Sequence, residues 1–306
     1  MIGSGFLSRL WDHDLAWSFR RSPVTVVAAA LTLVCVGAAA LSPWLSPQDP
    51  FNPAALDLNF AFKPPAWAEG GDPAFVLGTD NQGRDILSTI MHGARLSLGI
   101  GLASVVLALV LGVSLGLVSG YFGGRIDAVI MRVADVQLSF PAILIALLID
   151  GVARVALAGD RHDEIAIPVL VLSIGFAGWV QYARTVRGST MVERNKEYVQ
   201  AARVIGRRPL AILLKHVLPN VMGPVLVIAT IHIATAIITE ATLSFLGVGV
   251  PPTQPSLGTL IRVGNEFLYS GEWWITIFPG AALIVLVLSV NLLGDWLRDA
   301  LNPKLR

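Results

Sequence analysis

The chain has 306 residues, of which 54% are hydrophobic and only 14% charged, against about 25% charged residues in soluble domains; much of its exterior must therefore face lipid. The 22 Lys and Arg residues barely outnumber the 21 Asp and Glu residues, which excludes a nucleic-acid-binding protein because contacts with phosphates need a basic excess. Cys35 is the single cysteine and can form neither an internal disulfide nor, alone, a zinc site, so no metal site is predicted.

Six stretches are long and apolar enough to cross a hydrocarbon core of about 30 Å, which takes about 20 helical residues. They run approximately over Val24–Leu45, Leu96–Gly120, Ala128–Ile149, Ile165–Tyr182, Val217–Leu246 and Trp273–Leu293. The first is longer than the apolar part of a signal peptide. Asp12 and Asp14 also conflict with the basic N-terminal region that a signal peptide has, so we expect this stretch to be retained as a span. The sequence predicts an all-α integral membrane protein with six transmembrane helices.

Lys and Arg residues lie mostly in the cytoplasm if both ends of the chain are placed there, as the positive-inside rule requires. The chain then divides into a cytoplasmic N-terminal segment (1–22), a first transmembrane helix (23–45), an outer loop (46–95), a five-span core (96–293) that includes an inner loop (184–219), and a cytoplasmic C-terminal tail (294–306). Proline interrupts three of the predicted spans, at Pro141, Pro224 and Pro279, and predicts kinks there.

The end of the outer loop has helical periodicity. Ile86, Leu87, Ile90, Met91 and Ala94 share one helical face. Two interpretations fit this stripe equally well: a helix that lies on the membrane surface, and a helix that packs against the neighbouring span.

The inner loop is basic and contains a second helical pattern. Tyr198, Ala201, Ala202 and Ile205 form an apolar stripe, Gly206 is suited to end that helix, and Pro209 can begin another. The pattern predicts a short helix–glycine–helix unit in the cytoplasm, with small residues that let another protein approach closely.

Four motifs in the chain resemble those of one family. Gln200-Ala201-Ala202-x3-Gly206-x9-His216-x-Leu218-Pro219 resembles the Glu-Ala-Ala loop of the membrane subunits of ABC importers, with Gln200 at the glutamate position and Glu197 one turn upstream. The others are Gly78-Thr79-Asp80-x2-Gly83-Arg84-Asp85 followed by Gly93-Ala94-Arg95-Leu96-Ser97-Leu98, the stretch 244–252, and the stretch 293–303. These motifs resemble those of permeases that import dipeptides, oligopeptides or nickel. Within that family the chain resembles the C-type subunit, and it has features of the dipeptide branch. Thr89, Leu257 and Asn302 depart from the usual residues.

The resemblance implies a type I ABC importer transmembrane domain in the bacterial inner membrane, forming half of a pore for small peptides. It implies a heterodimer with a homologous B-type permease, two ABC ATPase subunits that hold ATP and Mg, and an extracytoplasmic solute-binding protein. This chain would bind no cofactor and would not be an enzyme. None of its lysines follows a glycine, so it lacks the Gly-Lys of a P-loop.

In this family the inner loop couples the pore to the ATPase. Residues 184–219 of this chain are therefore called the coupling loop. The coupling residues implied by the resemblance are Glu197, Gln200, Ala201, Ala202, Arg203, Gly206, Arg207 and Pro219.

Other residues leave alternatives open. Gly112-Val113-Ser114-Leu115-Gly116 matches the Gly-x-Ser-x-Gly motif of serine hydrolases, which would make the chain a membrane-embedded hydrolase with His232 as base. However, Gly112, Gly116 and Gly120 repeat every four residues inside a predicted span, a pattern typical of close helix packing.

Polar residues at membrane depth are the remaining candidates. His232, Glu240 and Asn291 fall inside predicted spans and are candidates for lining the pore, although a structural hydrogen bond is the favoured interpretation for each. The alternative for Glu240 is an ion-coupling site in a gradient-driven secondary transporter.

Overall fold

The computed structural model describes residues 18–52, 56–156, 162–251, 253–254 and 256–301. Apart from an isolated bridge between Thr79 and Asp85, the regular structure in these ranges is helical, as predicted. The long helices are α3 (Pro23–Ala40), α5 (Ile86–Phe122), α8 (His162–Glu193), α11 (Leu218–Phe245) and α13 (Trp274–Leu301). The shorter elements are α4 (Ser42–Leu45), η2 (Leu58–Phe60), α6 (Gly124–Leu138), α7 (Ala142–Ala156), α9 (Glu197–Val204), α10 (Pro209–Ile212), η3 (Leu213–Val217), α12 (Leu257–Phe267) and η4 (Leu268–Ser270).

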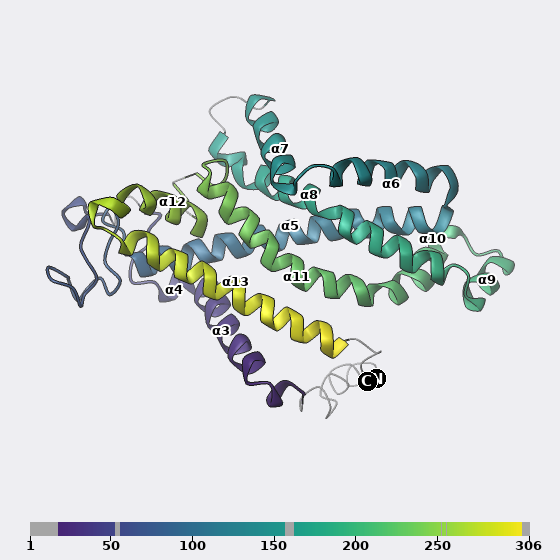
Figure 1. Cartoon of the computed structure of the whole chain (residues 1–306), viewed down its shortest axis with the longest axis horizontal. Coiled ribbons are helices and arrows are strands. Elements are labelled where there is room, and N and C mark those ends of the chain that lie inside the picture. Colours follow the sequence, from purple (N-terminus) through teal and green to yellow (C-terminus); the bar gives the residue numbers. More distant parts are fainter. Residues whose placement is uncertain (1–17, 53–55, 157–161, 252, 255, 302–306) are drawn as a thin grey trace.

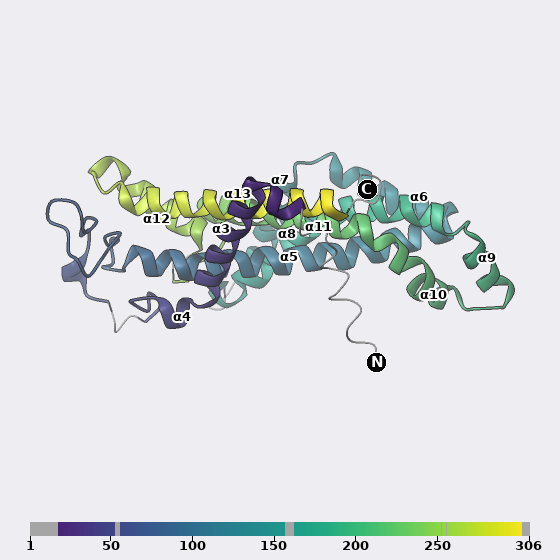
Figure 2. The ribbon, with the colours of Figure 1, turned by 90° about the horizontal axis from the view of Figure 1, so that it is seen from below.

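The five long helices are each long and apolar enough to cross a membrane. Of these, α5, α8, α11 and α13 run roughly along the length of the molecule, whereas α3 lies at a steep angle to them (Figure 1, Figure 2). The third predicted span is different. The stretch 128–149 does not form one continuous helix, because α6 ends at Leu138, α7 begins at Ala142, and the two are bent by 95°. Pro141 lies at this break, where its missing N–H and its ring prevent the helix from continuing.

Several helices extend beyond the predicted spans. α5 begins at Ile86, so the stripe at the end of the outer loop is the first part of a span packed among its neighbours, and the surface-helix interpretation is wrong. α8 continues to Glu193 and α13 to Leu301. Gly294 directly follows the predicted end of the sixth span but does not end α13.

The Gly78–Asp85 motif builds the start of α5. The Asp85 carboxylate caps the helix by accepting from Ser88 N at 2.8 Å, and Arg84 forms a buried ion pair with Asp80 at 2.6 Å. The Trp274 indole donates to Thr79 O at 3.0 Å. The motif thereby joins the outer loop, the first turn of α5 and the first turn of α13.

The most extensive helix contact in the described structure joins α5 to α8 through glycines. A Cβ placed on Gly112 would lie 2.4 Å from Trp179 O, one on Gly116 2.6 Å from Ala183 O, and one on Gly120 2.7 Å from Arg187 O. Real Cβ atoms essentially never approach other atoms this closely. The backbones therefore touch at a distance that only glycine permits, as in small-residue helix packing.

At one end of this contact, a polar link adds α6 to the pair. Arg187 of α8 donates to Asp127 of α6 from Nε at 2.5 Å and from Nη2 at 2.7 Å, and Ser119 of α5 donates to the same carboxylate. A bidentate pair of this kind fixes orientation as well as distance. Two further polar links tie the second half of α6 to α8: Arg184 donates to Asp135, and the Trp179 indole donates to Gln137 Oε1 at 2.6 Å.

We expect Gly116→Val to destabilise the protein by about 1–3 kcal/mol, because the added side chain would overlap the α8 backbone and force the helices apart. The measurement is the thermal unfolding midpoint of the purified protein. Gly99→Val is the matched control, since a Cβ at Gly99 of the same helix meets nothing within 4 Å. Equal destabilisation by both variants would contradict the glycine contact.

Candidate functional site

The coupling loop is narrower than predicted, because residues 184–193 continue α8 and the chain leaves that helix only after Glu193. It then forms α9, a turn at Gly206, α10 and the π-helical segment η3, which leads into α11. Gly206 has a φ of +79°, in the left-handed region that glycine adopts at little cost. The helix–glycine–helix pattern is therefore present, and it protrudes at the end of the molecule away from α12 (Figure 2).

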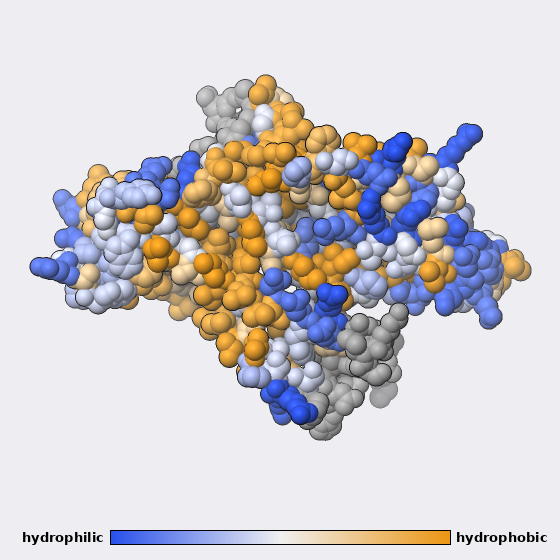
Figure 3. Space-filling view, viewed as in Figure 1, coloured by the Kyte–Doolittle hydropathy of each residue, from blue (hydrophilic) through white to orange (hydrophobic). Residues whose placement is uncertain are grey.

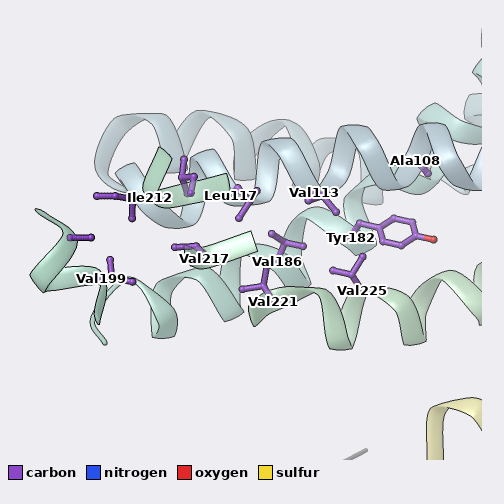
Figure 4. Packing of buried hydrophobic residues seen from close by; sticks show 12 residues of the cluster. Ala108, Val113, Leu117, Tyr182, Val186, Val199, Ile212, Val217, Val221 and Val225 are labelled. Atoms are coloured by element: carbon purple, nitrogen blue, oxygen red, sulfur yellow. The ribbon is translucent and has the colours of Figure 1, made fainter. Parts of the chain in front are cut away.

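One face of the loop is anchored in the core of the protein. Val199 of α9 is fully buried, and Ala202 is 6% exposed. Both belong to an apolar cluster with Leu117 of α5 and Val221 of α11 (Figure 4). Ala202 is thus the buried member of the predicted stripe, and Val199, which the sequence analysis missed, is its partner one turn earlier.

Arginines join the coupling loop to the end of α5. Arg203 Nε donates to the Tyr121 hydroxyl at 3.3 Å, and the guanidinium carbon lies 4.8 Å from the centre of the Tyr121 ring, a cation–π arrangement. Arg194 Nη1 donates to Gly120 O at 3.0 Å, where a positive charge also complements the helix dipole. Tyr121 belongs to no sequence motif, and the sequence analysis missed this contact.

Tyr198 joins the loop to both helices that flank it. Its hydroxyl donates to the Glu193 carboxylate at the end of α8 and accepts from Asn220 Nδ2 of α11 at 3.1 Å. Desolvation and the neighbouring Glu193 carboxylate raise the pKa of Tyr198 to about 12, so the hydroxyl remains protonated and keeps its role as donor. No sequence pattern singles out this role, since it depends on residues from three elements.

The opposite side of the coupling loop is exposed and apolar. Val204 is 88% exposed, Ile205 77% and Leu210 66%. Seven of the predicted coupling residues are exposed as well: Glu197, Gln200, Ala201, Arg203, Gly206, Arg207 and Pro219. Clustered apolar side chains on an exposed surface are typical of a site that another protein covers.

The predicted membrane-depth residues have different surroundings. The His232 ring lies between α11 and α8, with Nδ1 3.0 Å from the Tyr182 hydroxyl. Glu240 is fully buried and accepts from Ser244 Oγ at 2.7 Å, near Ser97 and Ser256. Asn291 is exposed on α13.

The geometry does not support a serine nucleophile. The Ser114 hydroxyl is exposed and donates to Val110 O at 2.7 Å and Leu111 O at 3.0 Å, within its own helix. The ring of His232, the proposed base, is bonded to Tyr182. Ser114 therefore behaves as an ordinary helical serine that satisfies its hydroxyl locally.

The comparisons with known proteins agree with the motifs. The family described as "Binding-protein-dependent transport system inner membrane component" matches residues 112–306. The di/tripeptide transport system permease protein DppC of Pseudomonas aeruginosa is 39% identical and covers 94% of this chain and 91% of its own length. The dipeptide transport system permease protein DppC of Escherichia coli is 41% identical, and the match covers 98% of this chain and 94% of that protein.

A solved structure gives the same fold. The inward-facing MetNI methionine ABC transporter matches with a TM-score of 0.53 at 18% identity, over 70% of this chain and 96% of the transporter chain. At this identity the match concerns the arrangement of helices alone.

We expect Tyr198→Phe to loosen the coupling loop, because the variant loses two hydrogen bonds that tie α9 to α8 and α11. Amide hydrogen exchange in residues 197–204 should become about three- to tenfold faster, as measured by mass spectrometry. Tyr269→Phe is the control, since Tyr269 is 97% exposed. Unchanged exchange in the Tyr198 variant would mean that its hydroxyl does not hold the loop.

Proposed function

The chain belongs to the family of binding-protein-dependent transport system inner membrane components, and on this basis we propose that it forms half of the translocation pore of an ATP-driven dipeptide importer. The substrate class is supported by relatives whose names specify di/tripeptide or dipeptide transport, at 39% and 41% identity over nearly the whole chain. The pore lies in the bacterial inner membrane, and both ends of the chain are in the cytoplasm.

The observation that carries the coupling role is the two-sided construction of the coupling loop. Its inner side is fixed to the long helices by Val199, Tyr198 and Arg203. Its outer side presents Val204 and Ile205 almost fully exposed. A partner that binds the outer side can therefore move the spans through the inner side.

The partner on this outer side is one of two separate ATPase subunits, which bind ATP and Mg. A homologous permease supplies the other half of the pore, and a solute-binding protein delivers the substrate from outside. Nucleotide drives transport only if it binds one arrangement of the subunits more tightly than the other, because a ligand with equal affinity for both shifts nothing.

The experiment that tests this proposal reconstitutes the chain with its co-purifying subunits in proteoliposomes and measures uptake of a labelled dipeptide. We expect uptake to require both ATP and the binding protein and to persist when ion gradients are collapsed. Uptake that survives ATP depletion but follows an ion gradient would instead identify a secondary transporter and refute the proposal.

Replacing Gly206 separates coupling from folding. In Gly206→Leu the left-handed φ costs about 1–2 kcal/mol, which should reshape the turn and lower dipeptide uptake about tenfold while the unfolding midpoint stays near that of the parent. A Cβ at Gly206 meets nothing within 4 Å, so no collision should destabilise the spans. Gly206→Asn is the control, because Asn tolerates this conformation better. Normal uptake by the Leu variant would exclude a coupling role for the turn.

A further inference from the structure

A cavity whose lining is apolar except for four polar side chains lies between α7, α8 and α11, in the membrane-spanning part of the chain. Its volume is about 330 Å³, and its polar lining consists of Gln181 of α8 and His232, Thr235 and Thr239 of α11. α7 meets α8 close to where α11 crosses it (Figure 1). On the same face of the molecule, hydrophilic residues lie between the apolar surfaces of α7 and of α13 (Figure 3).

The exposure of these side chains requires an explanation. Gln181 and Thr235 are exposed in the isolated chain, although both lie within helices that are apolar enough to span the membrane. Polar groups at membrane depth almost always face protein or a water-filled space, because lipid cannot satisfy them. This face of α8 and α11 is therefore directed away from lipid in the working protein.

The threonine side chains of the cavity can accept hydrogen bonds from a ligand, but their own protons are already used. Thr235 Oγ1 donates to His232 O at 3.0 Å, and Thr239 Oγ1 donates to Thr235 O at 2.8 Å. Each hydroxyl proton is thus used within α11, which leaves the hydroxyl oxygens free to accept. Gln181 adds an amide with both donor and acceptor groups.

The floor of the cavity is fixed. The His232 ring packs on Gly178, where an added Cβ would come within 2.2 Å of Cε1, and the Tyr182 hydroxyl holds Nδ1 at 3.0 Å. Among the residues that the structure describes, no Asp, Glu, Lys or Arg lines the space. The cavity offers neutral hydrogen bonding on a rigid surface, without a charge that would select particular side chains.

We propose that this cavity is a peptide-backbone site on the translocation path, in which Thr235 and Thr239 accept the peptide N–H and Gln181 binds the peptide carbonyl. The volume is at the small end of the range for ligand sites, about 300–1,000 Å³, as a dipeptide requires. Binding through the backbone tolerates different side chains. This inference rests on the proposed function and adds to it the groups that contact the substrate.

The test labels single cysteines in the complex held in lipid nanodiscs. Cys35 is replaced by serine, which removes the native cysteine, and Thr235→Cys is exposed to a charged methanethiosulfonate reagent. We expect fast labelling, slowed about three- to tenfold by saturating alanyl-alanine. The N-methylated analogue of alanyl-alanine, which lacks the peptide N–H, should protect much less.

Leu33→Cys on α3 is the control, since Leu33 is 76% exposed on an apolar helix and should react slowly because the charged reagent does not enter lipid. Labelling of Thr235→Cys as slow as that of Leu33→Cys would overturn the proposal. Equal protection by the two peptides would overturn recognition of the N–H.

A transport measurement completes the test. The double variant Thr235→Val, Thr239→Val should raise the KM for dipeptide uptake about three- to tenfold, while ATP-dependent uptake itself persists. Thr230→Val is the matched control: its hydroxyl donates to Val227 O at 2.8 Å in the same way, but the residue lies against Gly294 of α13. An unchanged KM in the double variant would refute only the backbone site. Absence of ATP-driven uptake in the parent protein would refute the proposed function.

Discussion

The contact between α5 and α8 is the constraint on which the other parts of the molecule depend. Gly112, Gly116 and Gly120 let the two backbones touch, and no larger residue could keep this spacing. The first turn of α5 carries the Asp85 cap, next to Thr79, whose carbonyl accepts from Trp274 of α13. The last turn of α5 carries Tyr121, which bonds to Arg203 of the coupling loop. A displacement of α5 against α8 therefore reaches both ends of the helix bundle at once.

The sequence predicted those features that depend on composition and local pattern. Five long spans follow from apolar length, and the turn between α9 and α10 follows from Gly206 and Pro209. The glycine repeat correctly indicated a helix contact, but not that α8 would be the partner. Glycine spacing marks a face of one helix and contains no information about the helix opposite.

The features that the sequence did not predict depend on tertiary contacts. α12 was missed, although Ser256 caps it by accepting from Thr259 N at 3.3 Å, because its 11 residues are too short for a spanning signal. Val199 was missed because the predicted apolar stripe of α9 included Tyr198 and Ile205. Both of these residues lie on the exposed side of the helix. Tyr121 bonds to Arg203 and Tyr198 to Asn220, residues that are distant in the chain, so no local pattern could identify these contacts.

The pairing of α5 with α8 also determines how often the chain crosses the bilayer. Contacts advance together along both helices, from Gly112 with Trp179 to Gly120 with Thr190, so the two helices run parallel. A chain that leaves α5 at its far end must return to the opposite side before it can begin α8. α6 and α7, each 15 residues or about 22 Å, are too short to span alone, so the bent pair makes this return crossing jointly. Counted with the five long helices, the bent pair brings the crossings to six, the larger of the two numbers that the helices allow.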